Sequence, residues 1–151
     1  MGFADVGSYL ATPEPFIRIT AMPTDTNPYG GVFGGWLMSQ MSLAAGSLAS
    51  RHSQGKAVVV AADALKFTGA PNVGDEISVY AELVKQGRTS MRIAVEVIAR
   101  ERDGDAETLV ASGEFTFVAL GTDDRPREIP SPLEGEGGAR PRDSGDGRVR
   151  G

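Results

Sequence analysis

The sequence predicts an α+β domain in which a curled antiparallel sheet of about five strands wraps around one long central helix. Three observations support this prediction. One segment of helical periodicity is apolar over most of its circumference, so that helix has to be covered on several sides. Most of the runs that follow it show the two-residue alternation of half-buried strands. Short turn signals separate these runs, and strands joined in this way are antiparallel.

The first predicted elements are a short strand and a loop. Residues 15–21 form the strand, whose apolar groups are Phe16, Ile17 and Ile19. Residues 22–31 form the loop, because Pro, Thr, Asp, Asn and Gly predominate there.

The helix is predicted over residues 33–51. Its apolar residues recur at intervals of three and four positions, namely Phe33, Leu37, Met41, Ala44, Ala45 and Leu48. Trp36, Met38 and Leu43 add apolar groups outside that stripe. A helix with this pattern is buried on several sides.

Four strand-like runs complete the domain. They cover residues 57–67, 76–85, 90–100 and 107–120. Turn signals lie at residues 71–75, 86–88 and 103–104, so we expect the runs to pair in order as an antiparallel meander. A single sheet around one helix leaves its edge strands uncovered, which predicts self-association.

Composition limits the function. The chain has 151 residues, no cysteine and a single histidine, His52. The lack of cysteine excludes a disulfide framework, thiolate metal sites and a cysteine nucleophile, and we expect neither a metal nor a cofactor. The formal net charge of −5 argues against a nucleic-acid partner. No run has the character of a signal peptide or a membrane span, so we expect a cytoplasmic protein with no membrane partner.

The last part of the sequence differs in composition from the rest. Residues 122–151 contain no aromatic residue and only Ile129, Leu133 and Val149 as large apolar groups. Such a segment buries too little surface to offset its ordering entropy. We therefore predict a folded domain over residues 1–121 and a disordered C-terminal tail over residues 122–151, with an interaction tail as the alternative.

The loop and the start of the helix carry the most specific motif. Residues 22–27 read Met-Pro-Thr-Asp-Thr-Asn, and residues 32–41 read Val-Phe-Gly-Gly-Trp-Leu-Met-Ser-Gln-Met. Further matches follow in order at Gly30, Phe67, 73–75, 87–90, 95–97 and 115–119. Together they resemble the YciA-type acyl-CoA thioesterases, in the cytosolic acyl-CoA hydrolase branch of the hotdog superfamily. The resemblance extends over about residues 14–121.

This resemblance implies a hotdog fold and the hydrolysis of acyl-CoA to free acid and CoA. It also implies a homodimer, which in the family is often assembled further into a hexamer as a trimer of dimers. The active site is expected at the dimer interface, where the loop asparagine of one subunit faces a carboxylate on the helix of the other. The predicted partners are thus the acyl-CoA substrate and further copies of this chain.

Thioester hydrolysis needs donors for the developing oxyanion and an oriented water. Gly34 and Gly35 lie at the predicted helix start, where backbone amides lack intrahelical acceptors. Helped by the helix dipole, these amides suit a thioester carbonyl, although the pair could also serve only a tight junction. Asn27 offers an amide donor and a carbonyl acceptor for the water or the thioester, and turn formation is its structural alternative.

Ser42 occupies the position where the family pattern carries an aspartate, the expected general base. A serine hydroxyl has no useful basicity at neutral pH, so it could only orient the water. Structurally, Gly35, Ser39, Ser42 and Gly46 form a stripe of small residues that would admit a second backbone. Asp63, expected on the same strand face as Leu65 and Phe67, is a candidate substitute base, and the favoured alternative is a hydrogen-bonded structural residue or one that reaches solvent at a sheet edge.

The predicted CoA-binding residues come mainly from one turn. By resemblance this is Gly87, Arg88, Thr89 and Ser90, where Arg88 offers a charged fork to phosphate and the hydroxyls offer further donors. Lys66 would add a second positive charge. Each of these residues could instead be a solvated surface residue, and His52 is assigned no catalytic role.

Two hypotheses of different classes follow. The first is an active acyl-CoA thioesterase, with turnover reduced because Ser42 replaces the aspartate. The alternative is a catalytically weakened hotdog protein that binds acyl-CoA as a sensor or as an assembly subunit. Ser42 is the feature that separates them.

Overall fold

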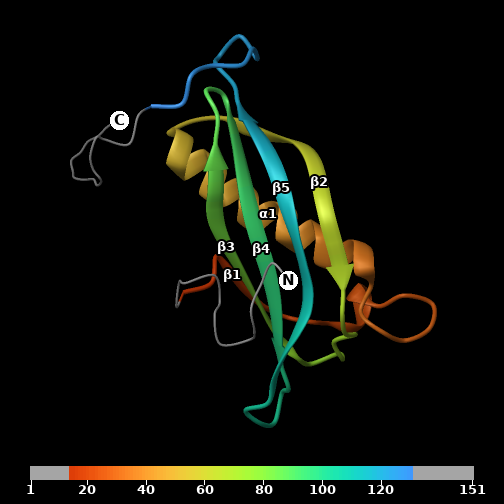
Figure 1. Cartoon of the computed structure of the whole chain (residues 1–151). Helices are drawn as coiled ribbons and strands as arrows, with labels where there is room; N and C mark the ends of the chain where they lie inside the picture. Colours follow the sequence, from red (N-terminus) through yellow and green to blue (C-terminus); the bar gives the residue numbers. More distant parts are fainter. Residues whose placement is uncertain (1–13, 131–151) are drawn as a thin grey trace.

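The computed structural model describes residues 14–130 and contains one long helix packed on a five-stranded sheet (Figure 1). In chain order the elements are β1 (Ile17–Thr20), the 3-10 helix η2 (Pro23–Asp25), α1 (Gly34–Ser53), β2 (Ala57–Phe67), β3 (Glu76–Gln86), β4 (Ser90–Arg100) and β5 (Glu107–Ala119). The predicted fold class is confirmed. Among the described residues, no helix is both long and apolar enough to cross a membrane.

The strand order corrects one expectation. The sheet runs β1-β3-β4-β5-β2 with every pair antiparallel, so β2 pairs with β5 and not with β3, which follows it in the chain. The turn signals between β2 and β3 belong to a crossing connection. At its start the Thr68 amide donates to the Val110 carbonyl, and near its end the Gly74 amide donates to the Ala21 carbonyl. The connection thus carries the chain from the β2 edge of the sheet to its β1 edge.

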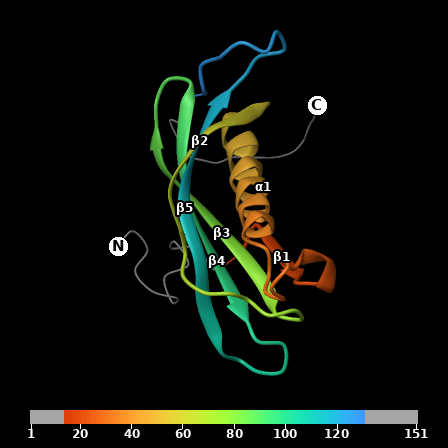
Figure 2. The same cartoon turned by 90° about the vertical axis from the view of Figure 1, so that its right-hand side faces the viewer.

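The core lies between α1 and one face of the sheet (Figure 2). Leu37, Met41 and the alanines of α1 are fully buried against it. The sheet contributes Ile77, Val79, Met91, Ile93, Val95, Val97, Ala111, Phe115, Phe117 and Ala119. Helix and sheet approach closely at Gly46, where an added methyl group would lie 3.4 Å from the Phe117 ring.

The sheet leaves one side of α1 uncovered within the subunit. Leu43 is 61% exposed and Met38 is 37% exposed, and Phe33 just before the helix is 51% exposed. The expectation that the helix is buried on several sides is therefore not met by one copy of the chain. An uncovered apolar face on a helix of this kind is typical of a contact between subunits.

The helix ends two residues beyond its predicted end. Gln54 adopts the left-handed conformation, with φ of 60° and ψ of 43°, and its amide donates to the Ser50 carbonyl. The chain then reverses at Gly55, whose amide donates to the same carbonyl. This is the usual way in which the last carbonyl groups of a helix are satisfied.

Residues 126–130, which we call the C-terminal strap, correct the predicted domain boundary at residue 121. The strap folds back on the domain: Ile129 is 7% exposed within the core cluster, and the Arg127 amide donates to the Ala119 carbonyl. The Arg127 guanidinium donates to the carbonyl oxygens of Ser53 and Leu120, both at 2.8 Å. Residues 131–151 of the predicted tail lie outside the described residues.

We therefore expect a chain shortened to end at Gly121 to be less stable than one that ends at Pro130. The shorter chain loses the burial of Ile129 and the charged hydrogen bonds of Arg127, which together correspond to about 2–5 kcal/mol of unfolding free energy. Urea denaturation of the two shortened chains measures the difference. Equal midpoints and slopes would contradict the anchoring role of the strap.

Candidate functional site

The helix start presents two backbone amides without acceptors. The amides of Trp36 and Leu37 both donate to the Phe33 carbonyl, at 3.0 Å and 3.2 Å. No side chain caps the helix, and the amides of Gly34 and Gly35 have no hydrogen-bond acceptor in the described part of the chain. Together with the positive end of the helix dipole, they form a donor pair for a carbonyl oxygen or an anion.

The space around the two glycines differs. A methyl group added to Gly34 would meet no atom within 4 Å, so the backbone there is open to a ligand. A methyl group added to Gly35 would lie 2.6 Å and 2.8 Å from two carbons of the Phe33 ring. Glycine at position 35 thus lets the Phe33 ring lie over the first helical turn.

Asn27 is part of a hydrogen-bonded loop that leads into α1. Its Oδ1 accepts hydrogen bonds from the amides of Tyr29 at 2.8 Å and Gly31 at 3.2 Å. Two accepted N–H groups also fix which side-chain atom is the oxygen. The side-chain carbonyl is therefore used within the loop, whereas Nδ2 has no acceptor among residues 14–130. Of the two roles expected from the sequence, donor and acceptor, Asn27 can offer a ligand the donor role.

Ser42 lies two turns along α1 from the glycines. Eight residues separate it from Gly34, which corresponds to about 12 Å along the axis. Its side chain is partly buried, and its hydroxyl has no hydrogen-bond partner among residues 14–130. The predicted stripe divides at this point: Gly35 and Ser39 are exposed, whereas Gly46 packs against Phe117.

Asp63 does not lie where the alternation in β2 predicts. It pairs directly with Glu114, and the neighbouring pair Ala62 and Phe115 marks the core face, so Asp63 points to the opposite face. A bulge at Ala64, which has a φ of 54°, shifts the register before Leu65 returns to the core. Asp63 is exposed and is thus separated from Leu65, contrary to the expectation of a shared face.

The predicted CoA-binding turn is the β3–β4 hairpin. The Gly87 amide donates to the Ser90 carbonyl at 2.9 Å, and the Thr89 carbonyl accepts the Ala119 amide at 2.9 Å. The Arg88 side chain is 76% exposed and pairs with Glu128, with 3.2 Å between Nη1 and Oε2. The turn is thus ordered and its guanidinium is reachable from solvent.

Lys66 lies far from this turn in the same subunit. Lys66 of β2 pairs with Ser112 of β5, and Ser90 of β4 pairs with Val118 of β5. Six strand residues correspond to about 20 Å. The two predicted positive charges therefore do not meet within one copy of the chain.

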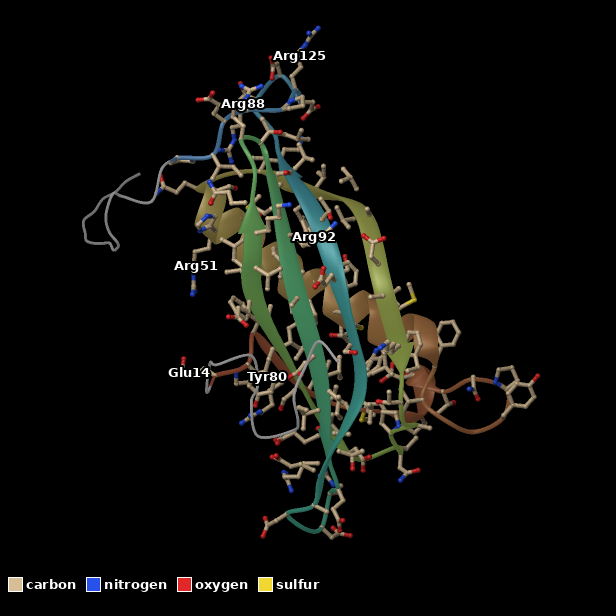
Figure 3. All side chains as sticks on the ribbon, viewed as in Figure 1. Glu14, Arg51, Tyr80, Arg88, Arg92 and Arg125 are labelled. Carbon is tan, nitrogen blue, oxygen red and sulfur yellow. The ribbon has the colours of Figure 1, made fainter. Side chains whose placement is uncertain are left out.

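The hairpin and the helix start are also far apart. His52, at the end of α1, lies 2.7 Å from Gln86 between its Nε2 and the glutamine Oε1, so the hairpin lies beside the C-terminal end of the helix. Gly34 begins the same 20-residue helix, which spans about 30 Å. Figure 3 shows Arg88 at one end of the molecule, together with Arg125. The predicted site is consequently spread over the subunit.

Sequence reasoning missed one residue next to the predicted site. Glu128 contacts Arg88, but composition alone assigned it to the tail. The only signal in that region was Ile129, a single large apolar residue within a run of Pro and charged residues.

Comparison with known proteins connects this geometry to a family. The model of the thioesterase superfamily matches residues 29–106. An uncharacterized acyl-CoA thioester hydrolase of Zymomonas mobilis is 52% identical over 78% of this chain and 78% of its own length. The acyl-CoA thioester hydrolase YciA of Salmonella typhimurium is 39% identical over 78% of this chain and 90% of its own. A hexameric hotdog fold thioesterase of Campylobacter jejuni superposes with a TM-score of 0.75 at 37% identity, over 78% of this chain and 90% of that one.

Proposed function

Because the chain belongs to the thioesterase superfamily, we propose that it is an acyl-CoA thioester hydrolase that releases the free acid and CoA. The observation that carries this proposal is the open helix start. The amides of Gly34 and Gly35 have no acceptor among the described residues, and the space beside Gly34 is empty. The cytoplasmic location expected from the sequence stays a prediction.

In this proposal the thioester carbonyl oxygen is bound by the amides at the helix start. A water molecule attacks the carbonyl carbon, the carbon–sulfur bond breaks, and one proton of the water passes to the departing thiolate. Each positioned donor to the developing oxyanion contributes about 2.7–4 kcal/mol to transition-state stability. The Asn27 Nδ2 group is a further donor, which suits it to the thioester oxygen or to the attacking water.

We propose that the complete site requires self-association. One copy leaves an edge strand with exposed valines: Val58 is 36%, Val59 45% and Val60 58% exposed. Such an edge readily pairs with a second copy of itself. The hexameric state of the Campylobacter jejuni relative supports assembly beyond a dimer, and we propose a trimer of dimers as its arrangement.

We further propose that residues 87–90 receive the phosphate-bearing end of CoA, with Arg88 as the charged ligand. The exposed guanidinium and the ordered hairpin amides support this role. Since Lys66 is distant in the same subunit, its contribution would come from a neighbouring copy.

The test combines hydrolysis with binding. We expect release of free CoA from a panel of acyl-CoAs, and binding of a non-hydrolysable acyl-CoA that weakens about three- to ten-fold on Arg88→Ala, because one charge-assisted contact is lost. Calorimetric titration measures the binding, and thiol release measures turnover. Absence of binding at millimolar ligand would contradict the proposal.

The serine at position 42 favours a second candidate, an acyl-CoA-binding protein without efficient turnover. It would be indicated if every acyl-CoA bound but none was hydrolysed. In that case the binding residues proposed above would stand and the hydrolytic roles would fall.

A further inference from the structure

The C-terminal strap lies against the proposed CoA-binding hairpin. The Ile129 amide donates to the Arg88 carbonyl at 3.0 Å, and the Ile129 side chain is buried in the core. Two residues earlier, the Arg127 guanidinium is held by the Ser53 and Leu120 carbonyl oxygens and by the Ser53 hydroxyl at 3.2 Å. The strap is therefore fixed on both sides of Glu128.

Fixing the backbone on both sides keeps the Glu128 carboxylate beside the hairpin. Its Oε2 lies 3.2 Å from the Arg88 Nη1. Glu128 is the only carboxylate with an ion pair to Arg88 among the described residues. Arg127 is engaged with backbone oxygens, whereas Arg88 and Arg125 are exposed at this end of the molecule, and Arg88 is the one that pairs with Glu128.

We propose that Glu128 is an internal competitor for the phosphate of CoA at Arg88 and thereby sets the affinity of the enzyme for CoA thioesters. The inference rests on the proposed role of Arg88. A phosphate and the Glu128 carboxylate are both acceptors for the same guanidinium, and the carboxylate takes Nη1, so a phosphate that binds bidentately through Nη1 and Nη2 must displace it. A carboxylate that stays nearby also repels the incoming phosphate.

The exposure of the pair makes this exchange feasible. Arg88 is 76% and Glu128 68% exposed, and exposed ion pairs of this kind are weak. A phosphate with a charge near −2 outcompetes a single carboxylate, whereas a ligand that lacks phosphate gains nothing from displacing it. The strap would thus favour ligands with the nucleotide end of CoA.

Replacing Glu128 by glutamine removes the competing charge and keeps the shape of the side chain. We expect Glu128→Gln to tighten binding of a non-hydrolysable acyl-CoA about two- to five-fold, the range that exposed ion pairs give. Binding of the matching acyl-pantetheine analogue, which has no phosphate, should not change. Calorimetric titration of both ligands measures the two effects.

Asp124→Asn provides the matched control. Asp124 lies near the strap and pairs with Lys56, and its φ of 64° suits asparagine as well as aspartate. It removes the same charge without touching Arg88, so the affinity for acyl-CoA should stay within error. An equal gain from Asp124→Asn would show a general charge effect and overturn the proposal.

A double-mutant cycle separates this inference from the proposed function. In an Arg88→Ala background, Glu128→Gln should have no effect, because the shared guanidinium is gone. If Arg88→Ala weakens binding but Glu128→Gln does not strengthen it, the competition is wrong and the CoA-binding role of Arg88 stands. If Arg88→Ala leaves binding unchanged, the CoA-binding role of Arg88 and the competition by Glu128 are both wrong. A gain that extends to acyl-pantetheine also overturns the inference.

Discussion

Replacing Ser42 by aspartate is expected to raise kcat for acyl-CoA hydrolysis by about 10²–10⁴-fold, the usual contribution of a positioned general base. Wild-type Ser42 offers a hydroxyl with no useful basicity, and its side chain has no hydrogen-bond partner among the described residues. Within one subunit, position 42 lies about 12 Å along the helix axis from Gly34, so in the proposed shared site a carboxylate there takes the proton of a water at the helix start of a neighbouring copy. Because the group acts on the transition state, the affinity for acyl-CoA should change little. Steady-state kinetics together with a binding titration measures both quantities.

Two control variants make this result specific. Ser39→Asp adds the same charge one turn earlier on an exposed position of α1 and should not raise kcat. Ser42→Asn has nearly the shape of the aspartate variant but no basicity, and it should also leave kcat low. The gain of the aspartate variant must disappear at low pH, where its carboxyl group is protonated.

A fast wild-type enzyme that Ser42→Asp slows would mean that another group acts as base. Asp63 was the candidate from the sequence, but it is exposed and faces away from the core side of β2. We therefore expect Asp63→Asn to leave turnover unchanged. Loss of turnover with retained binding in Asp63→Asn would contradict this expectation.

The double variant Val58→Lys with Val60→Lys is expected to abolish self-association and to lower hydrolysis at least about 10²-fold, the loss that follows removal of one oxyanion donor. Lysines on an edge strand oppose pairing with a second copy through charge repulsion and desolvation. We expect hydrolysis to fall because the helix start and the proposed CoA-binding hairpin lie at opposite ends of one subunit, so the proposed site takes its substrate contacts from different copies. Sedimentation and thiol release measure the two effects.

Val73→Lys is the matched control for this pair. Val73 is 45% exposed, a value between those of Val58 and Val60, but it lies in the connection between β2 and β3. It should keep both assembly and turnover. A monomeric double variant with full activity would show that the site is complete in one subunit and would contradict the shared-site proposal.

Local pattern was sufficient to predict the helix and the strands. Apolar spacing of three and four residues predicted α1, and alternation predicted β3, β4 and β5 to within a few residues, because side-chain periodicity follows directly from backbone geometry. Richness in Val and Ala predicted β2. The Gly34 and Gly35 donors were also predictable, since the free amides at a helix start require only that the helix begin there.

Long-range pairing was beyond local pattern. The sequence around residues 71–75 signals turns, but it does not state where in the sheet the next strand lies. The structure places β2 beside β5, at the opposite edge of the sheet from β1. The bulge at Ala64 was likewise not predictable from local pattern. One extra residue reverses the face of the side chains after it relative to those before it, so Asp63 and Leu65 lie on opposite faces of the strand.

The sequence by itself determined the elements, the fold class and the chemical nature of the helix start. Only the tertiary structure decided which of the predicted site residues lie together. The strap illustrates the reason. Residues 126–130 are held by carbonyl groups at the ends of α1 and β5 and by the core contact of Ile129. These partners lie outside the strap, so the composition of the strap does not reveal them. Order in a polar segment depends on acceptors supplied from elsewhere in the fold, and these are set by packing and not by the sequence of the segment.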